Sequence, residues 1–276
     1  MTADQELVDR LAEVWASIDA LGAELGDADW KRETECPGWT VQDNLAHLSN
    51  IEARLLGRPD PDHALPDDLP HVKNSFGKIN EMFVDSRRSW SGAGVQAEFH
   101  EVTRERVAAL RALSNEEFGA DSWTPMGPGA VRDLLPFRIF DSWVHEQDMR
   151  RAVGRPGDLD TAVAAHGLGM VTASMSFVVG KKVGTPEGSV VVFSLSGPLA
   201  RDVVVGIVDG RGRLLDGAPA DPPHNPTVRL RMSTETYARL GCGRIDPSAT
   251  AAAGDVTFEG DAELGQRIVD QMNYLF

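Results

Sequence analysis

The sequence predicts an α+β protein of two domains, in which a four-helix bundle precedes a small α/β domain with a mostly antiparallel sheet. Long segments before residue 157 repeat apolar residues at helical spacing. After the GRPGD segment at 154–158, short Val-rich runs alternate with Gly-containing turn signals, which is typical of strands. We therefore expect one domain at 1–157 and a second at 158–276.

Composition limits the classes of partner. The chain has 276 residues, a net charge of −15 and two cysteines, Cys36 and Cys242. Binding to nucleic-acid phosphates requires a basic face, so this charge argues against a nucleic acid and against an anionic membrane surface. Two cysteines exclude a disulfide framework and a cysteine-built zinc knuckle.

The N-terminal residues do not resemble a signal peptide. The segment MTADQELVDRLAEVW is acidic and amphipathic, whereas a signal peptide begins with basic residues and an apolar core. By inspection, no apolar run approaches the length that spans a membrane. We therefore expect a cytoplasmic protein that does not bind membranes.

The first two long helices are set by apolar spacing and turn residues. Residues 4–25 carry apolar positions at helical spacing, and Pro37-Gly38 marks a turn in the loop at 35–40. Thr40 is a suitable N-cap, and Asp43 occupies the capping-box position of a helix that continues to about residue 57.

The remainder of the first domain alternates loops and helices. Residues 57–71 are rich in Pro and Asp and predict a loop, and 72–113 predict helix with an interruption near 91–94. Residues 124–130 predict another loop. A fourth helix is expected at 131–153, with Pro136 in its opening turns, where it can bend the helix. Four helices of this length are expected to form an antiparallel bundle.

The second domain begins with a predicted helix at 160–179. Helices are also expected at 233–244 and 261–275. Strands are predicted at five Val-rich or alternating segments: 189–197, 202–210, 213–217, 227–232 and 255–260.

A candidate site lies on the fourth helix. Asp141 and His145 are four residues apart, so they share one face, where a carboxylate and an imidazole can bind one metal ion. His47, on the second turn of the second helix, is the candidate third ligand, because bundles build metal sites from facing helices.

Two further acidic residues are close in sequence to these candidates. Asp148 follows His145 by three residues, and we interpret it as a structural partner, for example of Arg151, rather than a ligand. Glu52 follows His47 by five residues and therefore points elsewhere, so we interpret it as a solvated or bundle-face charge.

Three motifs, CPGWTVQDNLAHL, DSWVHEQDMRRAVGRP and ARLGCGR, resemble the mycothiol-dependent maleylpyruvate isomerase family. The resemblance implies a DinB-like metal-binding bundle followed by a small domain similar to sterol-carrier folds. It places the metal ligands of the family on His47, Asp141 and His145. Asp141 replaces the glutamate of the family, which shortens the side chain by one C–C bond, about 1.5 Å.

The family also has a functional arginine in its second domain. Arg244 in the GCGR segment is the best match, and Arg229 and Arg231 are alternatives. The resemblance implies a site in the cleft between the domains, where this arginine faces the metal.

The chemistry implied by the resemblance is thiol addition. Two histidines and a carboxylate leave an open position on a divalent metal ion, with zinc as the first candidate, and mycothiol would occupy that position as a thiolate. The thiolate would add to a small electrophile. An isomerase would then expel the thiol after bond rotation, whereas an S-transferase would keep the adduct.

Two other functions are compatible with the same residues. One is a non-catalytic protein in which the metal is structural and the second domain binds an apolar ligand or a partner. The other is a DinB-like metal hydrolase that activates water, since an open metal position does not by itself select thiol over water. The sequence specifies neither the substrate, nor the metal, nor the oligomeric state.

Overall fold

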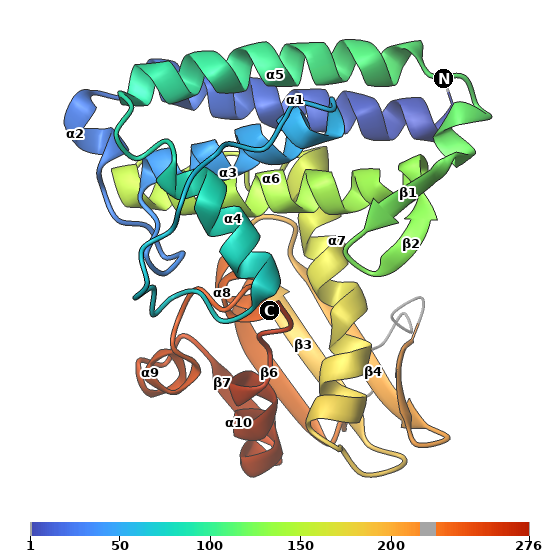
Figure 1. The fold of residues 1–276 in the computed structure, drawn as a ribbon. Coiled ribbons are helices and arrows are strands. Elements are labelled where there is room, and N and C mark those ends of the chain that lie inside the picture. The colour runs from blue at the N-terminus through green and yellow to red at the C-terminus, as the bar shows by residue number, and fades with distance from the viewer. Residues whose placement is uncertain (1, 216–224, 276) are drawn as a thin grey trace. The chain divides into compact units, whose positions relative to one another are not determined.

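A computed structural model describes residues 2–215 and 225–275. The chain divides into two compact units, Met1–Gly157 and Asp158–Phe276. The first unit is helical and the second contains a five-stranded sheet (Figure 1). This confirms the predicted α+β fold class.

The first unit is built on four long helices, as predicted (Figure 1). Buried apolar residues recur along α1 at helical spacing, for example Val8, Leu11 and Ile18, each at most 1% exposed. Shorter helices, α2 (Asp27–Trp30) and α4 (Ser75–Asp85), lie between the long ones. The four long helices are α1 (Ala3–Ala23), α3 (Val41–Leu55), α5 (Gly92–Ala112) and α6 (Val131–Val153).

The predicted capping box starts α3. The Thr40 hydroxyl accepts a hydrogen bond from the Asp43 backbone N–H, and the Asp43 carboxylate accepts one from the Thr40 N–H at 2.9 Å. This reciprocal pair satisfies two N–H groups at the end of the helix. It fixes the first residue of α3 and thereby the position of His47 on its second turn.

The predicted loop at 124–130 is instead part of a β-hairpin. Strand β1 (Asp121–Thr124) pairs antiparallel with β2 (Gly127–Ala130). Gly127 has φ of +112°, which a residue with a side chain rarely adopts, and the Thr124 hydroxyl donates to its carbonyl at 2.8 Å. Pro128 is tolerated because two-stranded sheets have only edge strands. Gly and Pro therefore mark a tight turn here rather than an irregular loop.

The second unit carries a sheet with strand order β5-β4-β3-β6-β7. Only β3 and β6 are parallel, so the prediction of a mostly antiparallel sheet is confirmed. The predicted strand at 213–217 ends earlier, and residues 216 and 217 lie outside the described part of the chain. The strands are β3 (Val190–Ser196), β4 (Arg201–Val208), β5 (Arg211–Leu214), β6 (Val228–Ser233) and β7 (Thr257–Gly260).

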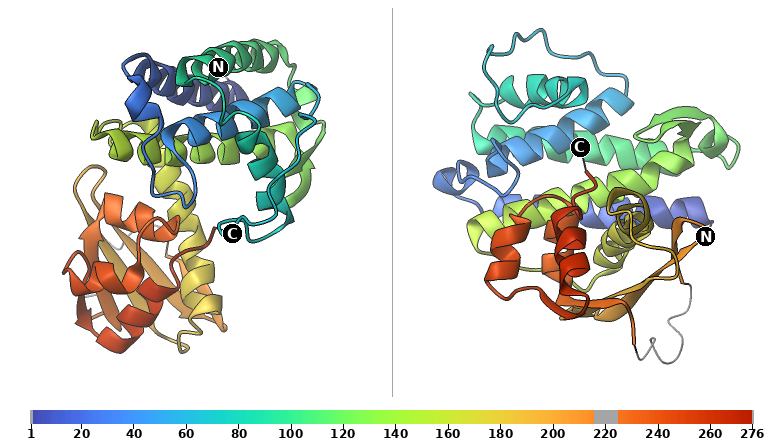
Figure 2. Two further views of the ribbon diagram at one scale, coloured as in Figure 1. Left: turned by 60° about the vertical axis from the view of Figure 1, so that its left-hand side comes forward. Right: turned by 90° about the horizontal axis from the view of Figure 1, so that it is seen from below.

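Three helices of this unit, α7, α8 and α10, whose bounds are given below, pack on one face of the sheet (Figure 2). The Tyr237 ring of α8 (Thr234–Gly241) contacts Phe193 on β3, with ring centroids 5.5 Å apart. Helix α10 (Ala262–Asp270) packs on Phe258 of β7, which shares this face. Helix α7 (Ala162–Phe177) continues into a π-helical turn, η2 (Val178–Lys182), and α9 (Pro247–Ala252) was not predicted.

The segment Ala162–Lys182 corrects the expectation that no apolar run approaches membrane-spanning length. By length and composition this helix would suffice to cross a membrane, with a mean hydropathy of 1.6 over 18 residues. It also packs against β5 and β4, and 44% of that window is buried. Buried core helices of globular proteins have the same composition.

Two glycines of this helical segment give opposite predictions. A Cβ added at Gly180 would lie 2.3 Å from the backbone nitrogen of Gly212, whereas one added at Gly169 would meet no atom within 4 Å. We expect Gly180→Ala to lower the free energy of unfolding by about 1–3 kcal/mol, because backbone atoms cannot move aside cheaply. Gly169→Ala should raise it by about 0.5–1 kcal/mol through helix propensity.

Thermal and urea unfolding of both variants, beside the unsubstituted protein, tests this prediction. If both substitutions change the free energy of unfolding in the same direction, the prediction is contradicted.

Candidate metal centre

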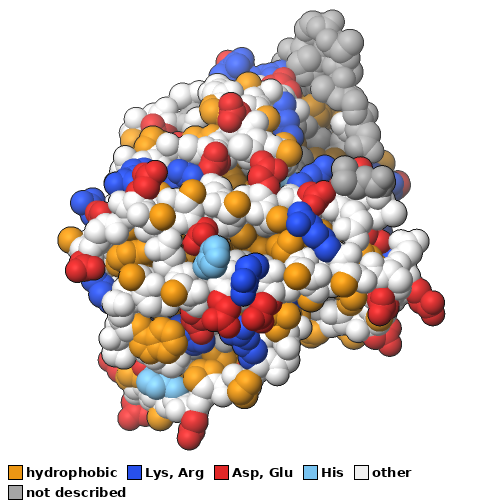
Figure 3. All heavy atoms as spheres, turned by 90° about the horizontal axis from the view of Figure 1, so that it is seen from above, with side chains coloured by type: hydrophobic (Ala, Val, Ile, Leu, Met, Phe, Trp, Pro, Cys, Tyr) orange, Lys and Arg blue, Asp and Glu red, His pale blue; other side chains and the backbone are white. Residues whose placement is uncertain are grey.

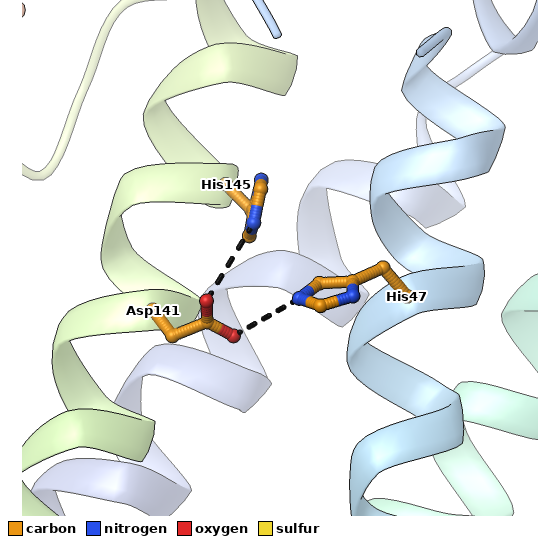
Figure 4. Close-up of side chains that lie close together, drawn as sticks. All are labelled: His47, Asp141 and His145. Atoms are coloured by element: carbon orange, nitrogen blue, oxygen red, sulfur yellow. Dashed lines mark ion pairs between the residues drawn. The ribbon is translucent and has the colours of Figure 1, made fainter. Parts of the chain in front are cut away.

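Three side chains from two helices converge in the bundle (Figure 4). His47 comes from α3, and Asp141 and His145 come from successive turns of α6. His47 Nε2 lies 3.4 Å from Asp141 Oδ2, and His145 Nε2 lies 3.7 Å from Asp141 Oδ1. One ligand atom from each residue lies within 4.8 Å of the others. The structure thus brings together the three residues that the sequence selects.

The tautomer of His145 is set by Asn44, one turn before His47 on α3. The Asn44 amide nitrogen donates to the Thr40 carbonyl at 2.8 Å, which can only accept, so its oxygen faces His145 Nδ1 at 2.6 Å. His145 must therefore carry its proton on Nδ1. Its Nε2 faces Asp141 and is the nitrogen left to bind a metal ion.

His47 is buried and lies against two aromatic rings. Its ring centroid is 4.9 Å from that of Trp39 and 4.9 Å from that of His145. Burial lowers the pKa of His47 below its ordinary value, against the opposing effect of the Asp141 carboxylate. His47 is consequently neutral at neutral pH, which is the form that binds metal ions.

Asp141 is bound by an arginine on its own helix. Arg138 Nη1 donates to Asp141 Oδ2 at 2.7 Å. Burial alone would raise the pKa of Asp141, but Arg138 and the two histidines hold it well below its usual value. The carboxylate is therefore ionised at neutral pH and 30% exposed, so it remains accessible to a ligand.

Glu52 corrects the interpretation of a solvated charge. It is fully buried and accepts hydrogen bonds from Arg138 Nε at 2.6 Å and from Arg106 Nε at 3.2 Å. Its position five residues after His47 does point away from the histidine. It points instead to Arg138, which contacts Asp141, so Glu52 is one residue removed from the site.

Trp39 is held over the two imidazoles by a second buried acid. Its indole N–H donates to Glu81 at 2.9 Å, and Glu81, only 1% exposed, also contacts His71 and Arg88. The indole and His145 ring centroids are 5.7 Å apart. The ring of Trp39 thus covers one side of the site with apolar surface.

Asp148 has the structural role that the sequence suggests. It accepts a hydrogen bond from Arg151 at 2.8 Å and lies 3.4 Å from His145 Nδ1, on the side away from Asp141. It therefore supports the ring of His145.

The candidate arginines of the second unit differ in their surroundings. Arg229 pairs with Asp202 and Arg231 pairs with Glu259, across the face of the sheet. Arg244 donates to the Cys242 carbonyl at 3.0 Å in the turn after α8. Its role in the site stays a prediction.

The face formed by α1 and α5 carries acidic and basic side chains next to one another (Figure 3). Arg111 of α5 pairs with Asp9 of α1, and His100 of α5 pairs with Asp19 of α1. Charges of both signs alternate on this face, so it has no extended basic surface within the described residues.

The geometry fits a divalent cation. It offers two imidazole nitrogens and one carboxylate, with the tautomer of one histidine fixed and the other histidine neutral. Three protein ligands leave a further coordination position open, which is the pattern of reactive rather than structural zinc sites.

Comparison with protein-family models identifies the class of protein. The model described as "Mycothiol maleylpyruvate isomerase N-terminal domain" matches residues 11–150, and the "MDMPI C-terminal domain" model matches 162–267. The chain therefore belongs to the mycothiol maleylpyruvate isomerase family, which is a family of enzymes. A search of curated proteins finds no significant match.

Solved structures agree in fold. A crystal structure of the mycothiol-dependent maleylpyruvate isomerase aligns with 94% of this chain and 93% of its own, with 14% identity and a TM-score of 0.60. A mutant of that isomerase aligns over the same shares with a TM-score of 0.57. A sterol carrier protein from Yarrowia lipolytica covers 40% of this chain and 94% of its own at 13% identity, with a TM-score of 0.29, too low to carry an argument.

Sequence reasoning missed Asn44, Arg138 and the partners of Glu52. Asn44 lies three residues before His47, and Arg138 three before Asp141, so each is about one turn from a candidate ligand. A search for polar residues one turn away from each ligand would have found both. Trp39 was missed as well, although its ring contacts both histidines.

The depressed pKa of Asp141 gives a pH-dependent prediction for the metal-free protein. The ionised carboxylate stabilises the fold above the unfolded-state pKa of about 3.9, and this contribution is lost as pH falls toward the lower folded-state pKa. Asp141→Asn should therefore destabilise the protein most near neutral pH, and the difference should shrink below about pH 4.

Urea unfolding of both proteins with a chelator present, at several pH values between neutral and acid, measures that difference. A difference in unfolding free energy that is independent of pH would contradict the lowered pKa of Asp141.

Proposed function

We propose that the protein is a metal-dependent, mycothiol-using isomerase or S-transferase that acts on a small electrophile. The convergence of His47, Asp141 and His145 carries this proposal, because it gives three ligands and an open position in a chain that belongs to this family. Zinc is the first candidate metal, since two imidazoles and a carboxylate suit it. Placement in the cytoplasm stays a prediction.

A divalent metal held by His47, Asp141 and His145 would convert a thiol, whose free pKa is about 8.5, into a thiolate at neutral pH. The residues of the chain prepare the site for it. The hydrogen bond to Asn44 engages His145 Nδ1 and leaves Nε2 as its ligand atom, and burial keeps His47 neutral. Trp39 excludes water from one side of the two imidazoles.

The thiolate would add to an electrophilic carbon and place negative charge on the substrate. Arg244 is proposed to bind a carboxylate of the substrate or to stabilise this charge, since a guanidinium is matched to both. In an isomerase the adduct would rotate about the former double bond, and the double bond would then re-form as the carbon–sulfur bond breaks and the thiolate leaves. In a transferase the carbon–sulfur bond is kept and the carbon is protonated.

Substitution of the ligands tests the metal centre. We expect His47→Ala and Asp141→Ala to lose bound metal and thiol-transfer activity with mycothiol, because two ligands hold a metal far more weakly than three. His100→Ala is the matched control, since this histidine also pairs with an aspartate but is exposed on the outer face of α5. Metal analysis and activity assays give the result. Metal retained in both ligand variants would overturn the site.

The same assays separate thiol chemistry from the two other functions. Metal bound by the unsubstituted protein, with hydrolysis that does not depend on mycothiol and no mycothiol-dependent turnover, would favour a water-activating hydrolase. Metal bound with neither activity on any electrophile tested would favour a binding protein.

Substitution of the arginines tests the second unit. We expect Arg244→Lys to lower kcat/KM by about 100-fold with bound metal unchanged, since lysine cannot reproduce a planar two-donor contact. Arg231→Lys is the control, because Arg231 is exposed and paired with Glu259. Steady-state kinetics on both variants shows which arginine has the functional role. If Arg231→Lys or Arg229→Lys shows the loss instead, that residue has the role.

A further inference from the structure

We propose that Arg138 is a positioning residue that aims the Asp141 carboxylate at the two histidines. This inference rests on the proposed metal centre. It accounts for how the short side chain of an aspartate faces both histidines.

The carboxylate of Asp141 needs an external contact to fix its direction. The terminal torsion of an aspartate is broad, so the side chain alone does not orient its two oxygens. Arg138 Nη1 donates to Oδ2 at 2.7 Å, and this carboxylate places Oδ2 3.4 Å from His47 and Oδ1 3.7 Å from His145. The contact from Arg138 thus selects an orientation in which both oxygens face an imidazole.

Arg138 is itself held in place. It is 5% exposed, and its Nε donates to Glu52 at 2.6 Å. A guanidinium is planar and rigid, so fixing Nε also fixes the direction of Nη1. The second oxygen of Glu52 accepts from Arg106 on α5 at 3.2 Å. The positioning contact is therefore anchored on three helices, α3, α5 and α6.

The charges of this network are balanced. A lone arginine beside a cation site would repel the metal ion, because two positive charges a few ångströms apart interact strongly away from water. Here the two arginines, Arg106 and Arg138, are matched by two acids, Glu52 and Asp141. Arg138 can therefore orient the ligand while its own charge is offset by Glu52.

Cobalt binding tests the proposal apart from activity. Metal-free protein is titrated with Co²⁺, and visible absorption reports both the dissociation constant and the ligand geometry. We expect Arg138→Lys to bind Co²⁺ about 10- to 100-fold more weakly with an altered spectrum, the usual effect of removing a partner of a ligand. Lysine keeps the positive charge of Arg138 but not its rigid contact with both Glu52 and Asp141. A loss of Co²⁺ affinity would therefore measure how far Arg138 positions Asp141.

Arg87→Lys is the matched control. Arg87 is also buried, and its Nε also bonds a glutamate, Glu98, at 2.6 Å, but this pair lies outside the network of Glu52, Arg138 and Asp141. Its Co²⁺ affinity should be unchanged. An equal loss in both arginine variants would show general damage to the bundle and overturn the positioning role.

A longer acid provides a rescue. Adding Asp141→Glu to Arg138→Lys should recover most of the lost affinity, because the longer side chain reaches the histidines without the contact from Arg138. No recovery would count against the proposal. Glu52→Gln gives a second measurement if Arg138→Lys does not fold, as judged by circular dichroism, and is expected to weaken Co²⁺ binding because it loosens Arg138. Unchanged affinity in Glu52→Gln would then overturn the proposal.

Co²⁺ binding by the unsubstituted protein distinguishes failure of the proposed metal centre from failure of the positioning role. If it binds no Co²⁺, the proposed metal centre fails, and the role of Arg138 fails with it. If it binds Co²⁺ and Arg138→Lys binds equally well with the same spectrum, the metal centre stands and only the positioning role is overturned.

Discussion

The contact between α3 and α6 is the constraint on which the site depends. His47 lies on one helix and Asp141 with His145 on the other, so a small slip between them would separate the ligands. Apolar packing alone tolerates such slips, because it is not directional. Two directional contacts cross between these helices, one from Glu52 to Arg138 and one from Asn44 to His145. They lie on either side of the triad and fix its register.

These polar contacts include buried charges, whose removal from water is unfavourable. Removing charges from water costs several kcal/mol per ion, and a buried ion pair often contributes little net stability. Yet Glu52 is fully buried and bonds two arginines, and Glu81 is nearly as buried beneath Trp39. Glu52 holds Arg138, which contacts Asp141, and Glu81 holds Trp39, which lies against both histidines. Their distribution suggests that the bundle retains buried charge for geometry at the site rather than for stability.

The two histidines are prepared for metal binding in different ways. Burial acts on His47 and lowers its pKa, while a hydrogen bond from Nδ1 to Asn44 fixes the tautomer of His145. His47 is therefore neutral at neutral pH, and His145 has Nε2 as its ligand atom. Asp141, in contrast, is kept ionised by its neighbours and remains partly exposed. Neutral nitrogens beside an ionised carboxylate are the combination that binds a divalent cation.

The sequence alone determined the fold class and the residues of the candidate triad. Apolar spacing defines a helix even without tertiary context, and the four-residue interval between Asp141 and His145 places both on one face. The tertiary structure decided what those residues contact. Glu52 lies five positions after His47, and only the packing of α6 and α5 against α3 shows that it is buried between two arginines. Partners from different helices have no fixed sequence spacing, so the network that orients the triad cannot be predicted from periodicity.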